Sequence, residues 1–315
     1  MTSLVRLYGL TVRSELPLHQ DRPPADAQAV DLTITLGDPI VQPEELPPGK
    51  RLLHLQVSKQ FFAAWRTDEG YLLRFFDTCD VHYDRTLSSA VIHPVAGADP
   101  DLLAVLAGGT VLAFALAMRG EPVLHASAVQ IGDSALAFVG SSGMGKSTTA
   151  TLMCADGALL ITDDLLRLDL SSTPPTCSLG ATELRLRKAA GDLSDRFASA
   201  PGRRTTGDAR DALAIPASTT EKLPLAAIVI PLPDNSGERT TAEVTKLDGM
   251  AAFLQLARFP RLLGWEDEEV LGRQFQQLGE VVDRVPVFQA RLPWGPPFPA
   301  QLAADVRLAV GLESA

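Results

Sequence analysis

A phosphate-binding pattern near the middle of the chain constrains the fold more than any other feature. Residues 135–139 are apolar and strand-like, and they lead into Gly-Ser-Ser-Gly-Met-Gly-Lys-Ser at residues 140–147. The pattern G-x-x-x-x-G-K-S, set between a strand and a helix, directs backbone N–H groups and the positive helix end at a phosphate. The run from Thr148 to Cys154 favours such a helix. The sequence therefore predicts a nucleotide-phosphate site in an α/β fold.

The residues of this Walker A loop have separate expected tasks. Lys146 is long enough to reach the β- and γ-phosphates, and the Ser147 hydroxyl can complete the shell of a Mg²⁺ ion. The expected nucleotide-binding residues are Gly140, Ser141, Ser142, Gly143, Met144, Gly145, Lys146, Ser147 and Thr148. The loop predicts binding of a nucleotide or phosphate, but it does not determine the reaction.

Composition excludes several classes of protein. The net charge is −10 and no long basic run is present, so a nucleic-acid groove is not expected. Cys79, Cys154 and Cys177 are far apart and form no C-x-x-C pattern, which is typical of reduced thiols in a cytosolic protein. Residues 102–118 are uncharged, but the run is short for a membrane span and contains Gly108 and Gly109. We expect a buried core helix there, and a cytoplasmic protein.

The chain divides into two expected domains. Residues 1–95 contain short alternating strands separated by turn signals, which predicts a small, mostly antiparallel β-domain and a candidate for substrate recognition. Residues 96–315 contain the phosphate loop and alternating strands and helices. Within them, residues 191–206 are polar and rich in arginine, and we expect a mobile surface loop.

A hairpin places a histidine beside the loop. Gly132-Asp133 lies between the apolar runs 123–131 and 134–139, and this dipeptide is a two-residue hairpin signal. With this turn, position 126 pairs with 139, and His125 lies opposite Gly140. A histidine in an apolar strand can also be a plain core residue. The hairpin register supports a place near the phosphates instead.

Two adjacent carboxylates follow the next apolar strand. Residues 158–162 lead into Asp163 and Asp164, in a Walker-B-like arrangement. Adjacent residues of a regular strand point to opposite faces, but a twist at the strand end can bring both to the phosphates. One carboxylate would hold Mg²⁺ and the other would take a proton from an attacking hydroxyl. The alternative is one metal ligand beside a solvated residue or helix cap. His125 could then raise the pKa of Asp163 or contact the γ-phosphate.

The order of these motifs resembles the catalytic domain of the HPr kinase/phosphorylase family, whose fold is similar to phosphoenolpyruvate carboxykinase. The motifs are His125-Ala126-Ser127-Ala128, the loop at 140–147, Thr162-Asp163-Asp164 and Glu183-Leu184-Arg185. The resemblance implies a P-loop kinase domain preceded by a small, mostly antiparallel β (α+β) domain. The opening segment 8–18 resembles HPr-kinase-like peptide kinases of lasso-peptide (RiPP) biosynthetic clusters. The chain departs from the family pattern at Ala126, Thr148 and Leu186.

The resemblance implies an ATP- and Mg²⁺-dependent serine kinase acting on a peptide or small protein, in particular a precursor peptide. It implies that Asp163 is the general base, tuned by His125, and that Ser147 with Asp164 serves Mg²⁺. Lys146 would hold the triphosphate. Glu183 and Arg185 would line the site, with Arg185 stabilising the transferring phosphoryl group. A homo-oligomer is compatible with the resemblance, whereas no segment that would grip HPr itself is recognisable.

Two other functions stay open. A kinase of a small metabolite would need the same aspartate chemistry, and a nucleotide-sensing module would need only the loop and one metal carboxylate. Four further arginines could add positive charge to the phosphates, although each could also be a solvated surface residue. They are Arg203, Arg204, Arg258 and Arg261.

Overall fold

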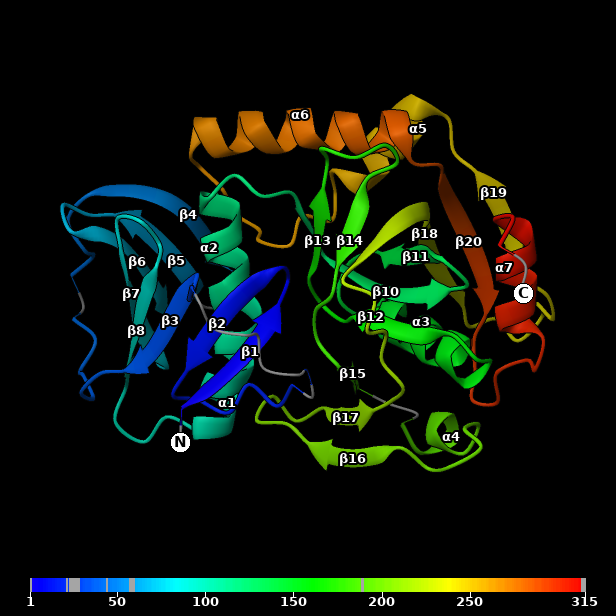
Figure 1. Ribbon diagram of the computed structural model, residues 1–315, viewed down its shortest axis with the longest axis horizontal. Coiled ribbons are helices and arrows are strands. Elements are labelled where there is room, and N and C mark those ends of the chain that lie inside the picture. Colours follow the sequence, from blue (N-terminus) through cyan, green and yellow to red (C-terminus); the bar gives the residue numbers. More distant parts are fainter. Residues whose placement is uncertain are drawn as a thin grey trace. The chain divides into compact units, whose positions relative to one another are not determined.

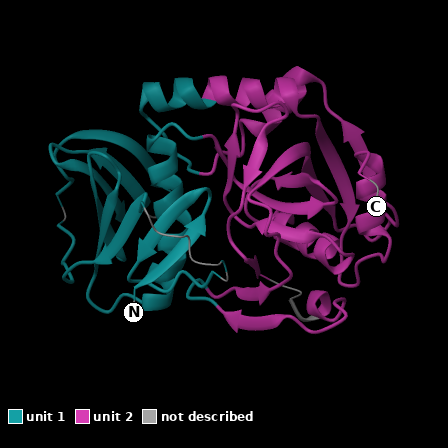
Figure 2. Cartoon of the chain, in the orientation of Figure 1, with its two compact units in different colours: residues 1–121, 206–208, 262–274 teal, residues 122–205, 209–261, 275–315 magenta. Residues whose placement is uncertain are grey.

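The computed structural model describes residues 2–20, 22, 29–43, 45–56, 60–187 and 190–312. It is a mixed α/β protein with several sheets, and the chain splits into two compact units (Figure 2). The first comprises residues 1–121, 206–208 and 262–274, and the second comprises residues 122–205, 209–261 and 275–315. The domain boundary expected near residue 95 falls at the end of strand β8, and the first unit continues to residue 121.

The first unit is built on one large sheet with the strand order β1-β2-β3-β8-β7-β6-β5-β4 (Figure 1). Strand β3 pairs in parallel with β2 and β8, and the other pairs are antiparallel, so the expected mostly antiparallel sheet is present. Its elements are β1 (Ser3–Leu7), β2 (Leu10–Ser14), β3 (Leu32–Leu36), β4 (Lys50–Gln56), β5 (Gln60–Arg66), β6 (Gly70–Phe75), β7 (Cys79–Asp84), β8 (Ser89–Pro94), α1 (Pro100–Leu106), the π-helix η1 (Ala107–Val111) and α2 (Leu112–Met118).

The apolar run 102–118 is a core helix of this unit, as predicted. By length and composition, residues 100–118 could cross a membrane, yet the residues from Leu112 to Ala117 are buried inside the unit. The hydroxyls of Tyr8 and Tyr83 donate to the carbonyl oxygens of Gly108 and Val111, at 3.3 and 3.0 Å. These bonds hold the π-helical segment against the sheet.

The second unit contains the remaining elements. They are β9 (Val123–Leu124), β10 (Ala126–Ile131), β11 (Ser134–Val139), α3 (Lys146–Ala155), β12 (Leu159–Thr162), β13 (Leu166–Asp169), β14 (Thr176–Ser178), β15 (Glu183–Leu186), α4 (Ala190–Ser194), β16 (Gly202–Thr205), β17 (Asp211–Ala214), β18 (Lys222–Asp234), β19 (Glu243–Lys246), α5 (Gly249–Leu256), α6 (Glu268–Arg284), β20 (Val287–Pro293) and α7 (Leu302–Ala309). The division between the units falls within α6.

Four strands of the main sheet in this unit end at the same edge. The nine-stranded sheet has the order β12-β10-β11-β18-β14-β13-β9, and off this path β20 pairs with β18 and β19 (Figure 1). Strands β11, β18 and β20 are parallel, and β12 shares their direction because both β12 and β11 are antiparallel to β10. The segments that follow β11, β12 and β20 therefore emerge together, and ligands of open α/β sheets bind outside such carboxyl ends.

Successive side chains of a strand point to opposite faces of the sheet, and both faces of this sheet are covered by helices. Leu136 and Phe138 of β11 pack into one core cluster with Met153 of α3 and Val306 of α7. The neighbouring residues of β11 pack into a second cluster, with residues of α5 and the C-terminal half of α6. This double covering fixes the strand that carries the phosphate loop.

The hairpin of β10 and β11 has the predicted register. Ala126 pairs with Val139 and Ile131 pairs with Ser134, so Gly132 and Asp133 form the turn. His125 immediately precedes β10 and Gly140 immediately follows β11. The histidine is therefore at the same end of the hairpin as the phosphate loop, as expected.

The polar segment 191–206 differs from the expected surface loop. It contains the end of helix α4 and strand β16, which joins a small sheet with the order β15-β17-β16. Arg203 and Arg204 pair with Leu213 and Ala212 of β17 through the backbone. Strand β16 has no alternating apolar residues, and for this reason its sequence predicted a loop.

Candidate nucleotide-binding active site

The phosphate loop connects β11 to α3 in the way that the motif predicts. Helix α3 begins at Lys146, and its N-cap, Gly145, has a left-handed backbone with φ of 85°. A Cβ atom on Gly145 would lie only 2.2 Å from the ring of Trp294. Glycine is thus required twice at this position, for the backbone conformation and for the contact with the indole. Ser147 and Thr148 follow in the first turn of the helix.

The rest of the loop closes on itself. The N–H of Ser141 donates to the sulfur of Met144 at 3.1 Å, and the Met144 side chain also packs against Gly140. Ser141, Ser142 and Gly143 are exposed. The loop therefore offers its backbone to a ligand from the solvent side.

Lys146 is buried at the centre of the site. Its Nζ donates to the carbonyl oxygen of Ser141 at 3.1 Å. Burial lowers the pKa of Lys146 to about 8, although the charges of Asp163 and Asp164 oppose that shift. The ammonium group thus lies between the loop and the aspartate pair, in a place where phosphate oxygens would favour its charged form.

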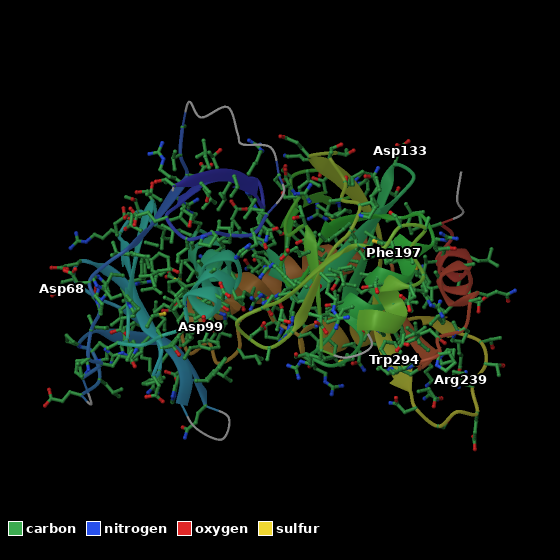
Figure 3. The ribbon with its side chains drawn as sticks, turned by 90° about the horizontal axis from the view of Figure 1, so that it is seen from below. Asp68, Asp99, Asp133, Phe197, Arg239 and Trp294 are labelled. Carbon is green, nitrogen blue, oxygen red and sulfur yellow. The ribbon has the colours of Figure 1, made fainter. Side chains whose placement is uncertain are left out.

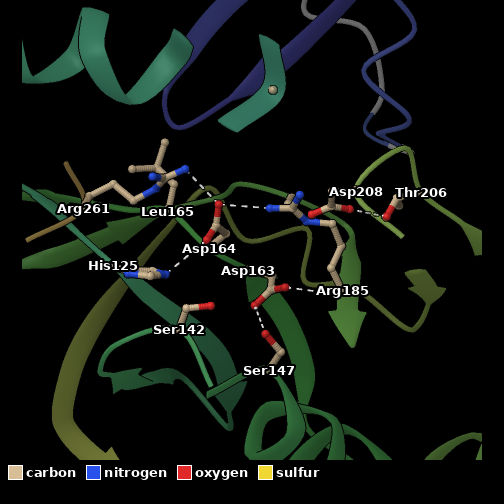
Figure 4. A network of polar contacts seen from close by, with 12 residues as sticks. His125, Ser142, Ser147, Asp163, Asp164, Leu165, Arg185, Thr206, Asp208 and Arg261 are labelled. Atoms are coloured by element: carbon tan, nitrogen blue, oxygen red, sulfur yellow. Dashed lines mark hydrogen bonds and ion pairs between the residues drawn. The ribbon is translucent and has the colours of Figure 1, made fainter. Parts of the chain in front are cut away.

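Asp163 is buried and accepts three hydrogen bonds, of which Figure 4 shows those from Ser147 and Arg185. Its Oδ1 receives the hydroxyls of Ser147 at 2.8 Å and Ser127 at 2.5 Å, and its Oδ2 receives the backbone N–H of Arg185 at 3.0 Å. These donors come from α3, β10 and β15 and fix the orientation of the carboxylate. Ser127 was not predicted as a site residue, because its place next to Asp163 depends on the pairing of β10 with β12.

Asp164 faces a different group of partners. His125 Nε2 lies 3.2 Å from Oδ1, and the Nη2 atoms of Arg185 and Arg261 lie 3.0 and 2.8 Å from Oδ2 (Figure 4). Burial favours a raised pKa, but Arg261, His125 and Arg185 outweigh it and hold the pKa of Asp164 well below its usual value. Asp164 is therefore a carboxylate throughout the physiological pH range.

These contacts differ from the roles that the resemblance implies, in which His125 tunes Asp163 and Ser147 serves Mg²⁺ together with Asp164. His125 contacts Asp164 rather than Asp163, and Ser147 contacts Asp163 rather than Asp164. The cause lies in the backbone, because Asp164 has a left-handed φ of 71° directly after the strand ends. This conformation turns the two adjacent side chains toward separate partners.

His125 is held as a neutral imidazole. Burial lowers its pKa, the hydrogen bond to Asp164 partly opposes the shift, and the charges of Lys146 and Arg261 lower the pKa further. A carboxylate partner requires the proton on Nε2, which leaves the lone pair on Nδ1. The residue is thus part of a polar network, and the alternative of a plain core histidine does not describe it.

Of the four further arginines, the structure brings Arg261 into this network. Its side chain is 10% exposed, and its Nε is buried with no hydrogen-bond partner among the residues that the structure describes. Arg203 instead pairs with Asp211, and Arg258 is exposed beside Gln255. Arg261 follows helix α5, far from the motifs in sequence, so no local pattern identified it among the four.

Glu183 and Arg185 share one face of β15, since they are two residues apart. Arg185 reaches Asp164, as expected of a residue that lines the site. Glu183 forms a bidentate ion pair with Arg204, with distances of 3.0 and 2.6 Å. Arg187, the next residue on this face, is exposed and donates to the hydroxyl of Ser142 at 2.9 Å.

The donor set fits Mg²⁺ better than a transition metal. Ser147 and Asp163 present hard oxygen atoms beside the loop, and Mg²⁺ prefers such ligands together with waters and substrate phosphates. Among the described residues, no group of three or more histidine, cysteine or acidic side chains could hold a metal ion. The protein would thus supply few ligands, and a nucleotide would supply the others.

No protein-family model and no curated protein matches the sequence. A solved structure of the Hpr(Ser) kinase/phosphatase from Coxiella burnetii is similar over 59% of this chain and 94% of that chain. The sequence identity is 12% and the TM-score is 0.30. At these values the likeness does not establish a family for this chain.

Proposed function

We propose that this protein is an ATP- and Mg²⁺-dependent kinase that transfers the γ-phosphate to a serine hydroxyl of a peptide or small protein. One observation carries the proposal: two separate acidic centres converge on the phosphate loop. Ser147 pairs with Asp163, while His125 pairs with Asp164. A module that only senses nucleotide would need the first centre alone. The second centre would supply a base that takes the proton of an acceptor hydroxyl.

The first centre is the proposed magnesium site. Ser147 and Asp163 would hold the ion, with Ser127 and the Arg185 N–H orienting the carboxylate. When bound, Mg²⁺ would neutralise charge on the β- and γ-phosphates. This assignment exchanges the roles that the family resemblance implies for the two aspartates.

The second centre is the proposed acceptor site. Asp164 would orient the imidazole through Nε2–H, and Nδ1 of His125 would take the proton of the acceptor hydroxyl. The hydroxyl oxygen would form the new bond to the γ-phosphorus as the bond to the β–γ bridging oxygen breaks. ADP would leave with that electron pair. Lys146, Arg185 and Arg261 would stabilise the charge on the transferring group.

The acceptor is proposed to be a precursor peptide, on the basis of the resemblance of residues 8–18 to peptide kinases of lasso-peptide clusters. We also propose that the first unit recognises this peptide, in the cytoplasm. Cross-linking of the full chain to a bound substrate peptide tests the second point. Adducts confined to residues 122–205, 209–261 and 275–315 would contradict it.

Transfer from γ-labelled ATP tests the reaction. We expect Lys146→Ala, Asp163→Asn and His125→Ala to abolish or strongly reduce labelling of a serine peptide. Arg203→Ala is the matched control, because it removes an exposed ion pair away from the network, and we expect full activity. Tight ATP binding with no transfer to any peptide, free serine or sugar would support the sensing module. Transfer only to a small molecule would replace the peptide acceptor.

A further inference from the structure

Trp294 lies at the same sheet edge as the phosphate loop, on the side away from the aspartates. It directly follows β20, which is two strands from β11 on one side, whereas β12 is two strands from β11 on the other. Neighbouring strands are about 4.8 Å apart, so β12 and β20 lie roughly 10 Å to either side of the loop strand. Strand β20 also extends further than β11, because Phe138 of β11 pairs with Val229 of β18 whereas Pro293 of β20 pairs with Asp234. A triphosphate that crossed the loop from Asp163 toward Gly145 would direct its nucleoside toward β20, because Trp294 contacts Gly145.

The indole touches the loop itself. The ideal Cβ position of Gly145 lies 2.2 Å from Cη2, 2.7 Å from Cζ2 and 3.0 Å from Cζ3 of Trp294, so the edge of the six-membered ring rests against the glycine. Trp294 as a residue is only partly buried. Trp294 belongs to the unit that contains the loop, and Figure 3 shows it apart from Asp133, which lies in the turn at the other end of the hairpin.

The ring is also held in place. Phe298 packs against it edge-on, with ring centroids 5.3 Å apart and an interplanar angle of 87°. The backbone N–H of Trp294 donates to the carbonyl oxygen of Asp234, at the end of β18, at 3.1 Å. An ordered, partly exposed aromatic surface next to a phosphate loop has the geometry of a stacking platform.

We propose that Trp294 is the platform on which the nucleobase of the bound nucleotide stacks. The proposal shares with the proposed function only the binding of a nucleoside triphosphate at the loop, and it does not depend on phosphoryl transfer. The competing possibility is that Trp294 only supports Gly145. In that case it would affect every ligand of the loop equally.

Binding of two ligands separates these possibilities. Equilibrium binding of ATP and of base-free tripolyphosphate is measured with Mg²⁺ on the full chain and on Trp294→Leu, which keeps an apolar side chain against Gly145. We expect the variant to bind ATP roughly 5- to 150-fold more weakly, the range of one base–aromatic stack. Tripolyphosphate binding should not change, and Trp294→Phe should retain most of the ATP affinity. An equal loss for both ligands, or none for ATP, would overturn the proposal.

Tryptophan fluorescence gives a second readout that no loop-support role predicts. The chain has three tryptophans, so Trp65→Phe together with Trp265→Phe leaves Trp294 as the single reporter. We expect ATP to quench this emission and tripolyphosphate to leave it unchanged. The same response to both ligands would overturn the proposal. Because neither experiment measures transfer, failure of the kinase assay would leave this inference intact, and the reverse also holds.

Discussion

The depressed pKa of Lys146 predicts that binding of a nucleotide at the loop would depend on pH. With a pKa of about 8 in the free protein, the amine is mostly charged at pH 7 and mostly neutral at pH 9. If only the charged form binds the triphosphate, the competent fraction falls from about 90% to about 10%, and the apparent dissociation constant rises roughly tenfold. The affinity should fall as the pH rises, because deprotonation of Lys146 removes the positive charge that would bind the phosphates.

Calorimetry tests this reasoning directly. At pH 8 about half of the free protein carries a neutral Lys146, so binding of ATP should take up about half a proton. This uptake is measured by repeating the titration in buffers of different ionisation enthalpy at saturating Mg²⁺. Lys146→Arg is the control, since a guanidinium stays charged across this range and should remove the uptake. A flat affinity between pH 7 and 9 in the natural chain, or the same slope in Lys146→Arg, would refute the assignment.

Three further predictions concern His125, Ser127 and the first unit. Because burial lowers the pKa of His125, transfer should be full above that pKa and fall as the pH drops through it; His125→Ala should lose roughly 10²- to 10⁴-fold in rate together with this acid limb of the kcat/KM profile. Ser127→Ala should raise the Mg²⁺ concentration needed for half-maximal rate while ATP binding without metal is unchanged; an unchanged Mg²⁺ dependence would refute its role in orienting Asp163. In the first unit, Arg74 and Asp80 form a buried bidentate pair, so Arg74→Met should lower the free energy of unfolding by about 3–5 kcal/mol in urea titrations, and adding Asp80→Leu should restore much of it.

Local sequence patterns correctly predicted those parts of the structure that are determined by residues close together in the sequence. The glycine spacing between β11 and α3 is typical of a phosphate loop, and a two-residue turn determines every pair of the β10–β11 hairpin. The core helix at 102–118 was predicted from an uncharged apolar run that contains Gly108 and Gly109. In each case, the responsible residues lie within one or two elements of each other.

Contacts between distant segments could not be predicted in this way. Arg261 and Trp294 reach the site from segments after α5 and β20, and nothing near them in sequence marks a ligand. The observed partners of Asp163 and Asp164 differ from those that the resemblance implied. The difference arises from the left-handed φ at Asp164, which is uncommon at a residue other than glycine and was not indicated by the sequence pattern. Strand β16 was missed because its arginines are stabilised by Asp211 and Glu183, which lie on other strands.

The left-handed backbone at Asp164 has a chemical consequence for the proposed reaction. If both carboxylates faced one Mg²⁺ ion, a neutral base for the acceptor would have to come from elsewhere. With the turn, Asp163 stays with Ser147 beside the loop, while Asp164 stays with His125 and two arginines. Strain of this kind persists only where the surroundings impose it, and here three cationic or hydrogen-bonding partners do so. In the proposed reaction, one dipeptide would thereby supply both a metal-binding carboxylate and an orienting carboxylate, and this separation would allow a phosphate loop to activate a hydroxyl rather than only hold a nucleotide.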